Sequence, residues 1–158
     1  MGPAAQEGLH RFTHKESFMS IFASPQFLSR VMWLDAASCA ATGALQLLPG
    51  DALARWTGLP NALLVGTGWF LLAYAAAAAW MASRVSAPRR AIGLVVLGNL
   101  LWAVGCGALL LSAALNLSAL GVAWVLVQAV VVVLLADLQW MGLRASSLSR
   151  GGRQLAAG

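Results

Sequence analysis

The sequence contains little charge. Of its 158 residues, 9% are Asp, Glu, Lys or Arg, whereas 60% are hydrophobic. Soluble domains carry about 25% charged and about 45–50% apolar residues. The shortage of charge therefore excludes an ordinary soluble domain and indicates an integral membrane protein.

Histidine and cysteine are also scarce. The two cysteines, Cys39 and Cys106, lie in apolar segments, and the only histidines are His10 and His14. A metal or haem site within the apolar segments would lack ligands, so we expect no metal and no other cofactor. The cysteines would also lie at different depths of their helices, too far apart for a disulfide. We interpret them as small buried apolar residues.

Recognisable catalytic motifs are missing as well. The sequence contains no HExxH, GxSxG or P-loop pattern and no pair of carboxylates at short spacing. The ten Lys and Arg residues lie mostly at the ends of apolar runs and form no basic stripe, so a nucleic-acid partner is not expected. These absences favour a protein that is not an enzyme.

Long uncharged runs divide the chain into four predicted membrane spans. No charged residue lies between Arg55 and Arg84 or between Arg90 and Asp137. The first interval accommodates one span of about 20 residues, and the second accommodates two. With the opening stretch, the predicted spans are about 25–48, 60–84, 89–114 and 118–143. The prediction is an all-α polytopic membrane protein whose residues 25–144 form a four-transmembrane-helix bundle.

The basic residues predict the orientation of these spans. Apart from Arg55, all Lys and Arg residues lie in the N-terminal flank, the loop after the second span or the tail. Cytoplasmic loops are enriched in Lys and Arg, so we expect both termini, including a tail over 145–158, on the cytoplasmic side of a bacterial inner membrane. Residues 1–24 would form either a short helix on the membrane surface or a disordered leader, with Met19 as an alternative start.

The two halves of the chain share short sequence matches. "DAASCAATGALQLL" from Asp35 aligns with "NLLWAVGCGALLL" from Asn99, and "WMASR" at 80–84 aligns with "WMGLR" at 140–144. A duplicated hairpin would give two tandem helical hairpins related by an axis along the membrane normal. Chance matches between sequences rich in Ala and Gly explain the same similarity, so both explanations stay open.

Three polar residues lie in the halves of the spans that are nearest the basic residues. Asp35, Asn99 and Asp137 are predicted to form a polar intramembrane layer. A carboxylate in the membrane costs roughly 2.5–3.5 kcal/mol on insertion scales, so it normally faces the bundle interior. Asp35 would either hold helices together, by a hydrogen bond to Asn99 or a pair with Arg30 or Arg84, or serve as a proton site, cation site or ligand anchor.

Other polar residues extend this pattern. Ser38, Thr42 and Gln46 follow Asp35 at helical spacing and form one polar face of the first span. Gln128 is the deepest polar group of the predicted spans, and we interpret it as a hydrogen-bonding contact between helices.

The first span and the segment "LLPGDALARWTGLP" (47–60), followed by three more spans, resemble uncharacterised bacterial four-helix inner-membrane proteins. The layout is similar to that of the DoxX-like group, which also carries a Gly-Leu-Pro loop after the first span, here at 58–60. The resemblance covers about residues 30–143 and implies a four-helix bundle in a bacterial cytoplasmic membrane. Some relatives of that group are linked to quinone or redox systems.

Three functional hypotheses follow. The leading one is a non-enzymatic accessory or scaffold subunit that packs against membrane lipids and against protein partners or further copies of itself. The second is a small oligomeric transporter with Asp35 as its proton or cation site. The third is a quinone-associated redox protein, in which a quinone would lie between Tyr74, Trp102 and Trp124.

Overall fold

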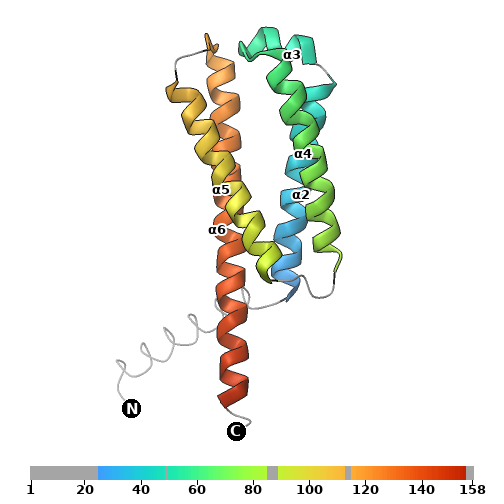
Figure 1. Cartoon of the computed structure of the whole chain (residues 1–158), viewed down its shortest axis with the longest axis vertical. Helices are drawn as coiled ribbons and strands as arrows, with labels where there is room; N and C mark the ends of the chain where they lie inside the picture. Colours follow the sequence, from blue (N-terminus) through green and yellow to red (C-terminus); the bar gives the residue numbers. More distant parts are fainter. Residues whose placement is uncertain (1–24, 49, 85–88, 113–114, 156–158) are drawn as a thin grey trace, which may run out of the picture.

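The computed structural model describes residues 25–48, 50–84, 89–112 and 115–155, with side chains up to Ala145. These residues form five helices and no strand, which confirms the all-α prediction. Figure 1 shows the helices as a bundle of two pairs. The surface helix or leader predicted for residues 1–24 lies outside the described residues.

The long helices follow the apolar runs of the sequence. They are α2 (Pro25–Leu47), α4 (Asn61–Ala82), α5 (Arg89–Leu111) and α6 (Ala119–Leu155). The first three differ from the predicted spans by three residues at most. Helix α6 instead runs twelve residues past the predicted end at 143, through most of the predicted tail, to Leu155. The apolar run ends near 143, but no proline follows to interrupt the helical hydrogen bonds.

A short helix, α3 (Gly50–Thr57), occupies the first predicted loop. Its first turn carries Asp51 and its last turn carries Arg55, an arrangement that suits the helix dipole. Its Leu53 is buried, whereas Asp51 and Arg55 are exposed. The sequence prediction missed α3 because eight residues are too few to show a clear helical period.

Three of the described helices are long and apolar enough to cross a membrane. They are α4, α5 and the Ala119–Ala145 part of α6. Helix α2 meets this criterion only together with α3, across a bend of 96°. The charged residues Arg30 and Asp35 lower the hydropathy of α2, although its length of 23 residues is sufficient for a span.

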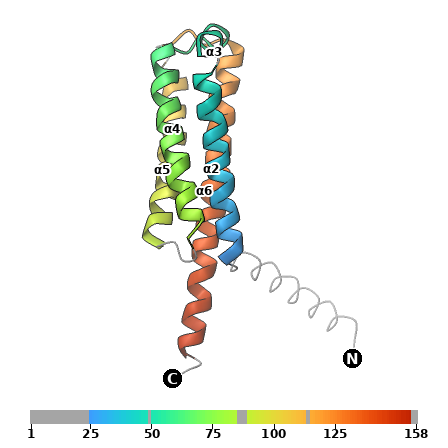
Figure 2. The same cartoon turned by 90° about the vertical axis from the view of Figure 1, so that its right-hand side faces the viewer.

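The long helices pack as two pairs. Helix α2 packs on α4, and α5 packs on α6, while α2 also contacts α6. The pairs converge at the end where α2 begins, here called the basic end because Arg30, Arg84 and Arg89 lie there, and they separate toward α3 (Figure 1). Figure 2, turned by 90°, shows α3 at the opposite end of the bundle. Gly43 and Gly68 bring α2 and α4 together, since a Cβ on Gly43 would lie 2.8 Å from the Gly68 carbonyl oxygen.

Helix α3 is joined to the start of α6. The Ser118 backbone N–H donates to the Thr57 carbonyl oxygen at 3.0 Å, and the Ser118 hydroxyl accepts from the Gly121 N–H at 3.1 Å. Gly58 follows α3 in the left-handed region, at φ 75°, as residues just beyond a helix end often do. These contacts anchor α3 across the end of the bundle that is opposite the basic end.

Candidate functional site

The Asp35 carboxylate is completely buried and is the centre of a hydrogen-bond network. Its Oδ2 accepts from the Gln139 side-chain amide at 2.7 Å and from the Asn99 side-chain amide at 3.0 Å. The Tyr74 hydroxyl lies 3.3 Å from the same oxygen. The Cys39 thiol lies 3.6 Å from Oδ1. Asp35 has 0% exposure, so the protein replaces the hydration of the carboxylate with these donors.

The donors come from all four long helices. Cys39 belongs to α2, Tyr74 to α4, Asn99 to α5 and Gln139 to α6. Asn99 also donates to the Gln139 side-chain oxygen at 3.3 Å, which links the two amides to each other. One carboxylate therefore ties both helix pairs together near the basic end of the bundle.

The arginines considered as partners of Asp35 lie elsewhere. Arg30 and Arg84 are exposed, and the Arg84 guanidinium lies 4.4 Å from the centre of the Trp80 ring. Asn99 is the partner that the sequence suggested and that the structure places beside Asp35. Neutral donors thus surround the carboxylate in the described part of the chain.

Asp137 does not join the polar layer. Its side chain is exposed, while Gln139, two residues along α6, is buried and contacts Asp35. Residues two positions apart on a helix face nearly opposite directions, so only one of them can point into the bundle. The sequence does indicate that Gln139 is a polar residue of the bundle interior, because it lies on the same helical face as Gln128. Tyr74 could also have been found, because it is the only tyrosine of the chain and lies within an apolar run.

The polar face of α2 divides into two parts. The Ser38 hydroxyl donates to the Asp35 backbone carbonyl within the same helix at 2.9 Å, and Thr42 is half-buried. Gln46 is buried at the α3 end of the helix, where its side-chain oxygen lies 2.9 Å from the Thr67 hydroxyl of α4. Gln46 therefore helps to hold α2 against α4 and does not belong to the Asp35 network.

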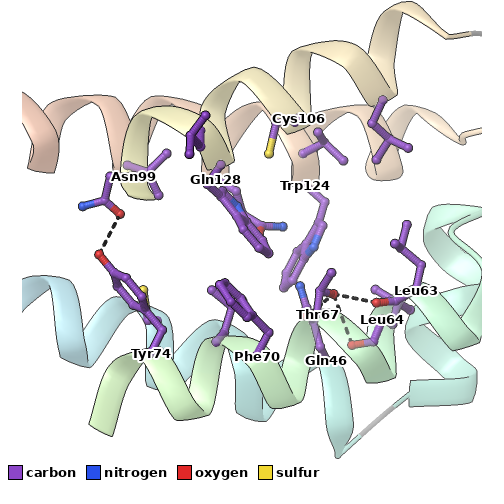
Figure 3. Close-up of a pocket in the computed structure, with 18 of the residues that line it drawn as sticks. Gln46, Leu63, Leu64, Thr67, Phe70, Tyr74, Asn99, Cys106, Trp124 and Gln128 are labelled. Atoms are coloured by element: carbon purple, nitrogen blue, oxygen red, sulfur yellow. Dashed lines mark hydrogen bonds between the residues drawn. The ribbon is translucent and has the colours of Figure 1, made fainter. Parts of the chain in front are cut away.

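A cavity of about 540 Å³ lies between the two helix pairs (Figure 3). Its walls are almost entirely apolar, and four aromatic side chains contribute to them: Phe70, Tyr74, Trp102 and Trp124. The few polar side chains that line it are Gln46, Thr67, Asn99 and Gln128. Gln128, predicted as a hydrogen-bonding contact between helices, is one of the residues that line the cavity.

The cavity meets the Asp35 network at one end. Tyr74 and Asn99 line the cavity and also contact the carboxylate, so they separate Asp35 from the cavity space. Figure 3 shows these two side chains facing each other at one end, with Trp124 and Gln128 further along. Among the described residues, no group of three or more His, Cys, Asp or Glu side chains could hold a metal ion.

Comparison with known proteins gives no family assignment: no protein-family model, no curated protein and no solved structure matches this chain. The resemblance to the DoxX-like group therefore stays a prediction.

Proposed function

We propose that this chain is a non-enzymatic, four-span protein of a bacterial inner membrane that holds a lipophilic molecule from the bilayer, acting as an accessory subunit. The observation that carries the proposal is the apolar cavity between the two helix pairs. Its volume of about 540 Å³ lies within the range of about 300–1,000 Å³ that is common for sites of small ligands.

The cavity is accessible from the side of the bundle. Two residues that line it, Phe70 of α4 and Leu101 of α5, are 56% and 61% exposed, so the surface between α4 and α5 is open. In a spanning bundle this surface faces lipid, so a molecule would enter from the bilayer between α4 and α5. The Phe70 and Trp102 rings stack across this side, with centroids 5.8 Å apart and planes 2° apart.

The buried position of Asp35 supports α2 as a fourth span. A helix of 23 residues is about 35 Å long, enough for a hydrocarbon core of about 30 Å. The charge that weakens its apolar signal is hidden from lipid among four donors. Arg55 lies on α3 at the opposite end from Arg84 and Arg89, which suits an orientation with the basic end in the cytoplasm.

Reporter fusions test this topology. Fusions after residue 54 are expected to behave as external, and fusions after residues 86 and 150 as cytoplasmic, because the basic residues favour the cytoplasmic side. Alkaline phosphatase is active only on the external side and the fluorescent protein only on the cytoplasmic side. At each fusion site one reporter is therefore the control for the other. An external reporter after residue 150 would contradict this topology and would mean that the spans are miscounted, first of all in the 91–136 region of α5 and α6.

A cavity-filling substitution tests the binding function. Gly105 lines the cavity, and a Cβ at this position would meet no atom within 4 Å. Gly105→Leu is therefore expected to fill part of the cavity without displacing the backbone. Protein purified in mild detergent should carry a lipophilic molecule that mass spectrometry detects, and the bound amount should fall several-fold in Gly105→Leu.

The matched control is Gly107→Leu, on the same helix. A Cβ on Gly107 also meets no atom within 4 Å, but Gly107 does not line the cavity. This variant should retain the bound molecule at the wild-type level. Equal retention in both variants, or no bound molecule in the wild type, would contradict the proposal.

One observation favours a second candidate, a transporter that uses Asp35 as its proton or cation site. A buried carboxylate lies behind Tyr74 and Asn99 at the end of the cavity, and intramembrane carboxylates often mark ion pathways. Under this alternative, Asp35→Asn would abolish resistance to lipophilic cations although the protein still folds. The third candidate, quinone binding, places its ligand in the same cavity, since Tyr74, Trp102 and Trp124 all line it.

A further inference from the structure

One hydrogen-bonding group on the α6 wall of the cavity is buried and has no partner among the described residues. The Trp124 indole nitrogen is buried and makes no hydrogen bond. Gln128, one helical turn further along, is half-buried and also lines the cavity. Figure 3 shows both side chains projecting into the cavity. Buried donors are normally paired, so the Trp124 N–H calls for an acceptor.

We propose that the cavity binds one acyl chain of an ester lipid, with the ester carbonyl oxygen accepting a hydrogen bond from the Trp124 indole N–H. The inference rests on the proposed lipophile-binding function and names the class of ligand. The chemistry follows from the site: an N–H donor requires an acceptor, and an apolar slot requires a hydrocarbon body.

The depth of Trp124 fits the ester region of a bilayer. The part of α6 suited to a span, Ala119–Ala145, has 27 residues and is about 40 Å long, or about 5 Å longer at each end than a hydrocarbon core of about 30 Å. Trp124 lies five residues from the start of α6, about 8 Å along its axis. The indole therefore lies at the border between hydrocarbon and headgroups, where acyl esters lie.

The length of the cavity fits one acyl chain. On α5 the lining residues extend from Gly98 to Leu109, which at 1.5 Å per residue is about 16 Å along the helix. One leaflet of the hydrocarbon core is about 15 Å thick. A chain whose ester lies at Trp124 would extend toward Tyr74 and Asn99 along the part of the slot that α6 lines from Trp124 to Val132, about 12 Å, while Leu63 and Leu64 line the slot on the other side of Trp124. None of the described residues that line the slot is Lys or Arg, which agrees with an uncharged group there.

A matched pair of lipids tests this inference. The full chain is placed in nanodiscs of equal parts dioleoyl phosphatidylcholine and its dialkyl ether analogue, which lacks the carbonyl oxygens, and is then released for native mass spectrometry. The wild type is expected to retain the ester lipid about three- to tenfold over the ether lipid, the range that one hydrogen bond provides. Trp124→Phe should bring this ratio close to one.

Two further measurements keep the result interpretable. The ratio compares two lipids within each variant, so a general loss of stability in Trp124→Phe would change both amounts alike. Trp69→Phe is the matched control, because Trp69 is 64% exposed and does not line the cavity, and it should keep the wild-type ratio. In NMR spectra, the indole N–H resonance of Trp124 is identified as the one that Trp124→Phe lacks. In the wild type this resonance should lie further downfield in the ester lipid than in the ether lipid.

The outcomes separate the two proposals. Equal retention of both lipids, lowered in both cases by Gly105→Leu, would overturn the ester inference and leave the cavity function standing. Retention of a different lipophile, with neither of the two lipids bound, would also overturn the ester inference and leave the cavity function standing. Retention of nothing, by wild type and Gly105→Leu alike, would overturn the cavity function itself.

Discussion

Asp35→Leu is expected to destabilise the bundle substantially, whereas Asp35→Asn is expected to have little effect. Leucine removes the acceptor that Asn99, Gln139 and Tyr74 share, and leaves only the longer contacts of Asn99 to the Gln139 oxygen and of Tyr74 to the Val95 carbonyl and the Asn99 oxygen. Interhelical hydrogen bonds in membranes are worth about 0.6 kcal/mol on average and up to about 1.7 kcal/mol. Three such bonds correspond to a loss of roughly 2–5 kcal/mol, measured as the free energy of unfolding in mixed micelles.

The geometry explains why asparagine is tolerated. Oδ2 of Asp35 accepts from three of the four donors, and Oδ1 contacts only the Cys39 thiol. An asparagine oxygen in the place of Oδ2 keeps the three contacts, while its amide nitrogen faces the sulfur, a weak acceptor. Removing the charge also removes its burial cost. We therefore expect a change of less than about 1 kcal/mol for Asp35→Asn.

Asp137 provides the control for this pair of variants. It is the same residue type in the same bundle, but its side chain is exposed, so Asp137→Leu should unfold close to the wild type. Asp35→Leu as stable as the wild type would exclude the structural role of the carboxylate. Asp35→Asn as unstable as Asp35→Leu would show that the negative charge, and not the acceptor geometry, holds the helices together.

Gly121→Ala is expected to destabilise the bundle strongly. A Cβ on Gly121 would overlap the Thr57 carbonyl oxygen at the contact between α3 and α6. Both partners belong to the main chain, so no side chain can rotate away, and α3 must shift. Overpacking typically costs about 1–3 kcal/mol, and we expect about 3 kcal/mol here, measured by unfolding in mixed micelles.

Gly93→Ala on α5 is the control for Gly121→Ala. A Cβ on Gly93 meets no atom within 4 Å, so the added methyl group enters open space. Alanine in a helix is favoured over glycine by roughly 0.5–1 kcal/mol, so this variant should be as stable as the wild type or slightly more so. Destabilisation by both substitutions to a similar degree would show that the contact between α3 and α6 is not tight.

The sequence alone determined that the described chain is helical, and where its long helices lie. Shortage of charge and long apolar runs are properties of composition and local order, and they do not depend on tertiary contacts. Local pattern also drew attention to Asp35 and Asn99, because a polar side chain within an apolar run is unusual wherever the helix packs. It could not detect α3, whose eight residues hold too few turns.

Only the tertiary structure decided which polar groups meet. Asp35 and Gln139 are separated by 104 positions. The face shared by Gln139 and Gln128 is visible in the sequence, but no local pattern reports that this face of α6, and not the face of Asp137, meets Asp35. The cavity likewise arises from the separation of two helix pairs, which depends on where glycines allow close approach and where α3 joins α6. Spacing along one helix defines its faces, but the neighbour that each face contacts is set by packing of the whole bundle.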